Sequence, residues 1–277
     1  MKPVEPIDTI DLFPPLSWKL LDLLQRLRPA DWARPTACDP WSVKDVAAHL
    51  LGGNLGRLWK RDQSPASSGK PPRDFDNLVR SIDRDNELWV QAAERISPEM
   101  LVELLELTDR RLYDHFKNLP QHEPARISVA WAGDKRSPNW FDIAREYTEK
   151  WLHQQHIREA VGKPLLMGRE WLFPVLDTFM RGLPYTYHKF LASNGTSISV
   201  QVTGKAGGEW SLVRERSQWK LFEGRDALAG SRVCIDQDLA WRLFTRGVTW
   251  EEARPQVQIE GDVALGEHVL RMVSIMA

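Results

Sequence analysis

The chain has little cysteine, and its two cysteines, Cys38 and Cys234, lie far apart in the sequence. They form no CxxC motif and no paired spacing, which excludes a disulfide framework and a metal site built of thiolates. Cys38 stands just before a predicted helix, and we interpret it as a small apolar packing residue rather than as an activated thiol. A metal site in this chain is therefore expected to use nitrogen and oxygen ligands.

An excess of charge of one sign is also missing. The 37 lysines and arginines nearly balance the 38 aspartates and glutamates, which argues against a nucleic-acid or anionic-membrane partner. Residues 1–15 carry acids and prolines where a signal peptide needs a basic start and an apolar run, and no stretch approaches the roughly 20 apolar residues of a membrane span. We expect a soluble, cytoplasmic protein with small-molecule partners and leave its oligomeric state open.

The first part of the chain has apolar residues at helical spacing. Helices are predicted at residues 17–27, 42–61, 74–95, 98–118 and 139–161, with a polar loop at 62–74. Ser42 and Asp45 are arranged as a capping box, Ser97 and Pro98 suit a helix start, and Gly162 suits a helix end. Helices joined by short and medium connections are typical of an antiparallel bundle.

The pattern changes after Pro164. A helix is predicted at 169–191, and then alternating segments at 197–204, 209–215, 218–224 and 231–237 predict an antiparallel sheet. Helical spacing returns at 239–247 and 264–276. Because 277 residues exceed the usual size of one domain, we predict an α+β protein of two domains. They are an antiparallel four-helix bundle over residues 1–164 and a smaller α+β domain over residues 165–277.

Metal-ligating side chains occur on two of the predicted helices. Glu149, His153 and His156 follow one another at i, i+4 and i+7, so they share one helix face. One ion could use Glu149 with His153, or His153 with His156, but hardly all three. His49 lies among apolar positions that face the core, where it is either a hydrogen-bonded core residue or a third ligand. Mixed imidazole and carboxylate ligands suit catalytic zinc, with nickel, iron and manganese as alternatives.

Two segments of the sequence resemble a known family. PWSVKDVAAHLLGGNLGRLW and EYTEKWLHQQHIREAVGKP resemble the N-terminal, metal-binding domain of the mycothiol-dependent maleylpyruvate isomerase family, a branch of the DinB-like bundle proteins. The resemblance implies that His49, Glu149 and His153 are zinc ligands. The resemblance also implies that His156 contacts the metal ligands without binding the metal, or is an alternative ligand. Family members commonly have aspartate at this position.

The second half resembles the domain that accompanies this bundle in the same family. GEWSLVRERSQWKLFEG and VQIEGDVALGEHVLRMVSIM are similar to a sterol-carrier-protein-like domain. The family's isomerase also uses an arginine from this domain, for which Arg246, Arg254 and Arg271 are the candidates here.

The function implied by the resemblance is an enzyme that depends on a divalent metal, most simply Zn²⁺, and on a low-molecular-weight thiol such as mycothiol or an analogue. The reaction would be a maleylpyruvate isomerase-like cis–trans isomerisation or the transfer of the thiol to an electrophile. Two alternatives remain open from the sequence: a DinB-like metal-dependent hydrolase, and a non-catalytic protein that binds an apolar ligand in its second domain.

Overall fold

The computed structural model describes residues 1–59 and 75–274, so the polar loop predicted at 62–74 lies outside the described residues. Backbone contacts divide the chain into two compact units. The helical unit contains the described residues between Thr9 and Pro120 together with Glu149–Leu165, and the sheet unit contains Met1–Asp8, Gln121–Thr148 and the described residues from Leu166 onward. The boundary near residue 164 stays a prediction.

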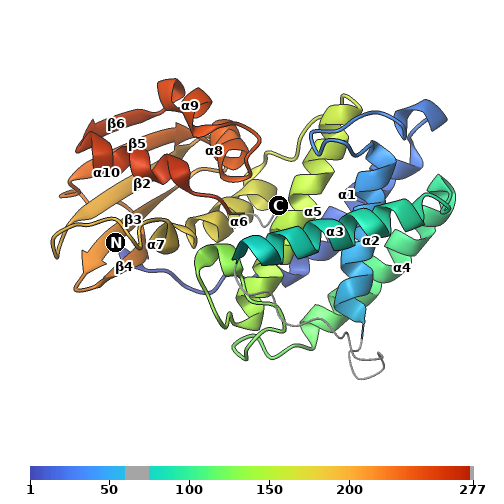
Figure 1. The fold of residues 1–277 in the computed structure, drawn as a ribbon, viewed down its shortest axis with the longest axis horizontal. Helices are drawn as coiled ribbons and strands as arrows, with labels where there is room; N and C mark the ends of the chain where they lie inside the picture. Colours follow the sequence, from blue (N-terminus) through green and yellow to red (C-terminus); the bar gives the residue numbers. More distant parts are fainter. Residues whose placement is uncertain (60–74, 275–277) are drawn as a thin grey trace. The chain divides into compact units, whose positions relative to one another are not determined.

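Long helices dominate the first part of the chain (Figure 1). They are α1 (Phe13–Gln25), α2 (Val43–Leu58), α3 (Phe75–Ala93), α4 (Pro98–Lys117) and α5 (Asn139–Ala160), the last of which contributes to both units. The predicted capping box is present, since Ser42 and Asp45 exchange side-chain to backbone hydrogen bonds. Ser97 caps α4, and Gly162 follows α5 at φ +65°. Local capping therefore sets where these helices begin and end.

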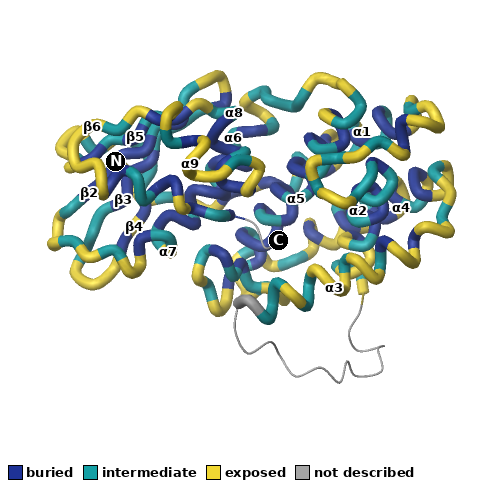
Figure 2. Tube along the Cα trace, turned by 45° about the horizontal axis from the view of Figure 1, so that its top comes forward, coloured by how far each residue is buried: buried dark blue, intermediate teal, exposed yellow. Residues whose placement is uncertain are grey.

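The core of the helical unit is an apolar cluster to which α1, α2, α3, α4 and α5 all contribute. It includes Leu24 from α1, Leu51 from α2, Leu105 from α4 and Ile157 from α5, all nearly inaccessible to solvent. Helix α2 packs against both α3 and α4, and Figure 2 shows buried residues along α2 and α4, whereas α3 is mostly exposed or intermediate. Because each fully buried leucine side chain contributes about 1.5–3 kcal/mol, this cluster holds α2 and the second half of α5 in fixed positions.

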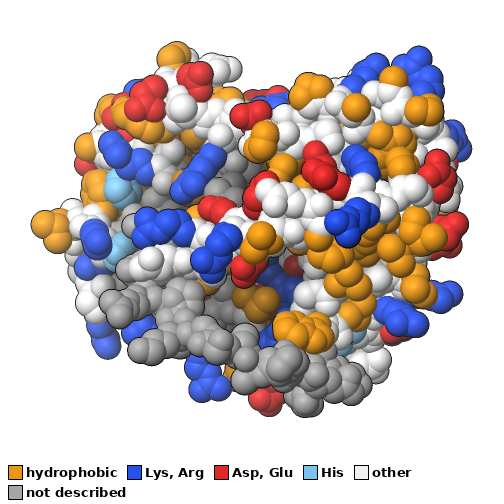
Figure 3. Space-filling model, turned by 45° about the vertical axis from the view of Figure 1, so that its right-hand side comes forward, with side chains coloured by type: hydrophobic (Ala, Val, Ile, Leu, Met, Phe, Trp, Pro, Cys, Tyr) orange, Lys and Arg blue, Asp and Glu red, His pale blue; other side chains and the backbone are white. Residues whose placement is uncertain are grey.

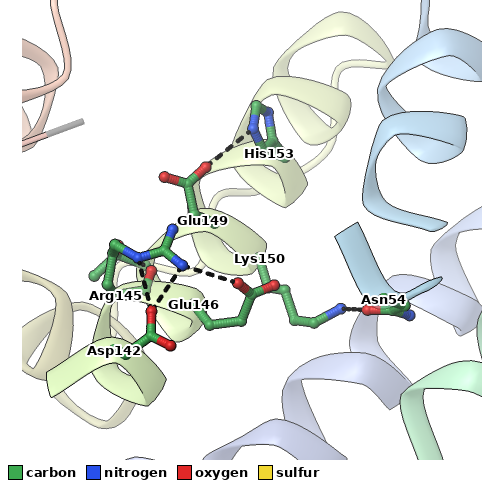
Figure 4. Close-up of polar contacts among 8 residues, drawn as sticks. Asn54, Asp142, Arg145, Glu146, Glu149, Lys150 and His153 are labelled. Carbon is green, nitrogen blue, oxygen red and sulfur yellow. Dashed lines mark hydrogen bonds and ion pairs between the residues drawn. The ribbon is translucent and has the colours of Figure 1, made fainter. Parts of the chain in front are cut away.

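A buried ion pair of Lys150 with Asp109 crosses the same core, and Figure 4 shows Lys150 with its other partner, Asn54. The Lys150 ammonium lies 2.9 Å from a carboxylate oxygen of Asp109, and these side chains are only 10% and 8% exposed. Lys150 also donates a hydrogen bond to Asn54 Oδ1 at 2.6 Å, while the Asn54 amide donates to Thr108 and Asp109. Ser17 donates to the other oxygen of Asp109. The network fixes the rotation of α5 relative to α2 and α4.

Two glycines of α2 differ in their surroundings and give a direct test of this packing. A Cβ at Gly52 would lie 2.5 Å from Cδ1 of Trp89, whose indole N–H donates to the Ala48 carbonyl, whereas a Cβ at Gly56 would meet no atom of the described residues within 4 Å. We expect Gly52→Ala to lower the free energy of unfolding by about 1–3 kcal/mol. Gly56→Ala should instead raise it by about 0.5–1 kcal/mol, because alanine favours the helix. Urea unfolding of the two variants measures both changes, and equal effects would contradict the packing described.

In the part of the chain that the structure describes, the sheet unit holds one six-stranded sheet in the order β1-β4-β3-β2-β5-β6. The strands are β1 (Lys2–Pro3), β2 (Ser197–Thr203), β3 (Gly208–Glu215), β4 (Gln218–Glu223), β5 (Ser231–Asp236) and β6 (Gln258–Gly261). The expected strands of the second half are present, but the sheet is mixed rather than purely antiparallel, since β2 and β5 run parallel. Alternation identifies a strand but not its neighbour. After β4 the chain crosses over β3 and β2 to the other edge of β2. There β5 pairs with β2 and runs in the same direction.

Shorter helices accompany the sheet. They are α6 (Arg169–Met180), α7 (Leu183–Thr186), α8 (Gln237–Phe244), α9 (Trp250–Ala253) and α10 (Val263–Glu267). The helix predicted at 169–191 is thus interrupted at Gly182, and the one predicted at 264–276 gives way to a 3-10 turn at His268–Arg271. Phe179 of α6 and Phe244 of α8 are fully buried and in edge contact, 6.4 Å between ring centroids.

The charged side chains on the surface are mixed in sign. On the face drawn in Figure 3, lysines and arginines alternate with aspartates and glutamates, and neither sign covers the face alone. Across residues 1–59 and 75–274, every helix is too short or too polar to cross a membrane.

Candidate metal centre

Three of the predicted site residues lie together in the helical unit. His49 comes from the middle of α2, and Glu149 and His153 come from successive turns of α5. One ligand atom from each of the three lies within 4.8 Å of the other two. The His49 and His153 rings are 4.7 Å apart between centroids, and His153 Nε2 lies 3.5 Å from a Glu149 carboxylate oxygen. Figure 4 shows this last contact between successive turns of α5.

One distance within this group matches that expected around a tetrahedral cation. A zinc ion bound at the usual distances holds neighbouring nitrogen and oxygen ligands about 3.4 Å apart, which is close to the 3.5 Å between His153 and Glu149. The side chains of His153 and Glu149 are 11% and 24% exposed, so they are mostly withdrawn from water yet still reachable. Two imidazoles and one carboxylate also leave a coordination position for a further ligand.

Two ionisable groups of the site perturb each other. Burial alone lowers the pKa of His153, but hydrogen bonds and electrostatic interactions with Cys38 and Glu149 outweigh it and raise this pKa to about 9. For Glu149, burial acts to raise the pKa. The hydrogen bond from His153 and the positive charges of His153, His49 and Arg57 outweigh it, so the pKa of this carboxyl lies below its usual value. The metal-free site therefore holds a carboxylate beside an imidazolium at neutral pH.

The opposite side of the His153 ring meets a second group of potential ligands. Cys38 Sγ lies 2.9 Å from His156 Nδ1 and 3.8 Å from His153 Nδ1. Cys38 does pack against the apolar cluster of the helical unit, as expected, but its interpretation as a packing residue alone is incomplete. The sequence offered no spacing signal for this contact, because 115 residues separate Cys38 from His153. His156 faces this sulfur, and its role behind the ligands or as an alternative ligand stays a prediction.

An aromatic ring borders the group on the α2 side. The Trp41 ring lies 5.0 Å from the His49 ring between centroids, and its indole N–H donates to a Glu87 carboxylate oxygen of α3 at 3.4 Å. Trp41 directly precedes the Ser42 cap of α2. The same local turn that starts the helix therefore also sets the ring beside His49.

Arginines suited to bind carboxylates occur in the sheet unit. Arg145, in the first half of α5, contacts Asp142 at 3.0 Å and Glu146 at 3.5 Å (Figure 4). Of the three candidates from the sequence, Arg254 is paired with Glu267 at 2.6 Å and Arg271 lies over the Trp250 ring. Arg246 has a left-handed backbone conformation at φ +61°. The identity of a substrate-binding arginine stays a prediction.

Comparison with known proteins identifies relatives of this arrangement. The family described as "Mycothiol maleylpyruvate isomerase N-terminal domain" matches residues 14–158, which include all three residues of the group. A solved structure of a histidine-to-alanine mutant of the mycothiol-dependent maleylpyruvate isomerase has a TM-score of 0.53 at 10% identity and covers 88% of this chain and 91% of that chain. The unmutated isomerase gives a TM-score of 0.50 at 10% identity with the same coverage, 88% and 91%. At this identity the likeness concerns the fold, and it confirms the α+β class. No curated protein sequence matches the chain.

Proposed function

The chain belongs to the family of the mycothiol maleylpyruvate isomerase N-terminal domain, and on that premise we propose that it is a metal-dependent enzyme that uses a low-molecular-weight thiol. The observation that carries the proposal is the convergence of His49, Glu149 and His153, whose ligand atoms lie within 4.8 Å of one another in the region that the family matches. The reaction we propose is a cis–trans isomerisation of the maleylpyruvate isomerase type.

The proposed ligands are His49, Glu149 and His153, with zinc as the cation that best suits two imidazoles and one carboxylate. A zinc ion bound there would supply Lewis acidity, which keeps a thiol at its open position in the reactive thiolate form at neutral pH. The protein's own contribution is to hold the three side chains in place. The apolar core fixes α2 and α5, and the withdrawal of His153 and Glu149 from water strengthens their electrostatic interactions.

The proposed reaction needs a nucleophile that is regenerated. The thiolate sulfur adds to one carbon of a cis double bond conjugated to a carbonyl, and the electron pair moves onto that carbonyl as an enolate. Rotation about the new single bond follows, and the enolate then expels the sulfur to give the trans isomer and the free thiolate. No atom or electron is gained or lost overall, so the thiol is required but not consumed.

Elemental analysis combined with a thiol screen tests this proposal. Wild-type protein should contain about one divalent metal per chain and isomerise maleylpyruvate only when mycothiol, bacillithiol or glutathione is supplied. Glu149→Gln, which keeps the size of the side chain, should lose the metal held by His49, Glu149 and His153, and the thiol-dependent activity with it. Glu159→Gln, at an exposed position of the same helix, is the matched control and should keep both. Turnover without any thiol would identify a hydrolase instead, and metal-free wild-type protein would refute the proposal.

The pKa of His153 gives the proposal a pH signature. Because this pKa is about 9 in the metal-free protein, a cation that binds His153 below that pH must displace a proton. Metal affinity should therefore fall roughly tenfold for each unit by which the pH drops below about 9. Competition with a chelator of known proton affinity, followed across neutral pH, measures this slope. An affinity that does not change with pH would show that His153 is not a ligand.

A further inference from the structure

A second cluster of metal-ligating atoms lies beside the site described above. Cys38, His153 and His156 each offer one atom, and these atoms lie within 4.8 Å of one another. The His153 ring stands between the two clusters, with Nε2 toward Glu149 and Nδ1 toward Cys38. We propose that Cys38, His153 and His156 form a second metal position, which takes a thiophilic cation such as Zn²⁺ or Cd²⁺.

The distances fit such a cation. A tetrahedral zinc ion holds a sulfur and a nitrogen ligand about 3.5 Å apart, given bond lengths of about 2.3 Å and 2.0–2.1 Å. The observed separations from Cys38 Sγ are 3.8 Å to His153 Nδ1 and 2.9 Å to His156 Nδ1. A side-chain rotation that moves the Cys38 sulfur or the His156 ring by a few tenths of an ångström would make the two separations more nearly equal. Both side chains are only partly buried, which leaves room for this movement.

The loop before α2 holds the sulfur in place without α5. Thr36 and Trp41 are joined across the turn by a backbone hydrogen bond of 3.1 Å, and Pro35 pairs with Ser42. Both backbone polar groups of Cys38 are hydrogen-bonded. Its N–H donates to Thr36 Oγ1, and its carbonyl accepts from the Trp41 N–H at 2.7 Å. The thiol therefore projects from a braced turn. Bracing of this kind is what a ligand needs if a cation is to bind without a large loss of entropy.

The ligand type separates the two positions. A thiolate with two imidazoles favours soft and borderline cations, whereas two imidazoles with a carboxylate also accept harder ones. A neutral imidazole has only one ring nitrogen with a free lone pair, so His153 can serve one position at a time. The positions are thus alternatives. If the proposed function is correct, a thiophilic cation at the second position would bind the only free lone pair of the His153 ring. His153 could then not bind the cation shared with His49 and Glu149, and the enzyme would be inhibited.

Cadmium titration of the reduced full-length protein tests the second position, because a thiolate bound to Cd²⁺ absorbs in the near ultraviolet. The variant to titrate first is His49→Ala, which removes a residue of the other position and leaves Cys38 and His156 unchanged. We expect this variant to develop the absorption band. Cys38→Ser in the same background should abolish the band and weaken Cd²⁺ binding at least about tenfold. Cys234→Ser is the matched control and should leave the band unchanged.

His156→Gln provides a second criterion if Cys38→Ser is poorly folded. It should move the titration midpoint at least about tenfold upward while the band at saturation persists, since the thiolate remains. Absence of the band in His49→Ala, its survival in Cys38→Ser, its loss in Cys234→Ser or an unchanged midpoint in His156→Gln would each overturn the inference. These results leave the proposed function untouched, because that is judged by the zinc content and thiol-dependent turnover of wild type against Glu149→Gln.

Discussion

Replacing His153 with alanine should leave the helical unit without bound metal and abolish the thiol-dependent activity. Among residues 1–59 and 75–274, His153 is common to both ligand groups, so no alternative set of three remains in that part of the chain after its loss. Removing a residue that hydrogen-bonds to a metal ligand already weakens metal binding about 10–100-fold. Removing the ligand itself should therefore lower the metal affinity by more than about 100-fold. Metal content after dialysis and turnover with a supplied thiol measure the two losses.

The control for this variant is a histidine in the same unit that has no part in either group. His115 is exposed on α4, and His115→Ala should keep both metal and activity. Circular dichroism establishes that His153→Ala keeps its helices, as expected because the apolar cluster is unchanged. A variant that retained about one metal per chain and full turnover would contradict the assignment of His153.

The largest expected effect on stability comes from Lys150. Lys150→Met would leave the Asp109 carboxylate, which is only 8% exposed, without its cationic partner. Breaking a buried pair by removing one partner costs about 3–5 kcal/mol, because the remaining charge is uncompensated. For a chain of this size that corresponds to a fall in Tm of roughly 10 °C, measured by thermal or urea unfolding. Lys117→Met, at an exposed position of α4, should change stability by less than about 0.5 kcal/mol.

Removing both charges separates the cost of an orphaned charge from the value of the pair. Lys150→Met combined with Asp109→Leu should recover most of the loss, since apolar replacements of a buried pair are often neutral or stabilising. Asn54 limits the recovery, because its Oδ1 loses the hydrogen bond from Lys150 and an unsatisfied buried acceptor costs about 1–3 kcal/mol. A double variant no more stable than Lys150→Met would show that the pair itself stabilises the bundle.

The helices were predictable because their signals are local. The Ser42–Asp45 capping box, the Ser97 cap and Gly162 after α5 act within a few residues, and the structure places helix ends at all three. The parallel pairing of β2 with β5 was not predictable from the same evidence, because alternation along a strand carries no information on its neighbour. The pairing of β1 with β4 across more than 200 residues is missing from the sequence pattern for the same reason.

The candidate site shows the same division. Glu149, His153 and His156 share one helix, so their spacing predicted a common face, and the inward position of His49 followed from its apolar neighbours on α2. The contact of Cys38 with His156 arises from a turn before another helix, where neither helical spacing nor composition has predictive value. Sequence spacing offered His153 with either Glu149 or His156. In the structure Glu149 lies beside Nε2 of His153, whereas the Cys38 sulfur, which contacts His156, lies beside Nδ1.

The position of the cation is the most direct test of the proposed centre. Crystals of the wild-type protein grown with zinc, measured on both sides of the zinc absorption edge, locate the ion by its anomalous signal. We predict a peak about 2.0–2.2 Å from a nitrogen of His49, a nitrogen of His153 and an oxygen of Glu149. The absence of a peak among these three residues, at a zinc concentration that saturates the protein in solution, would contradict the account.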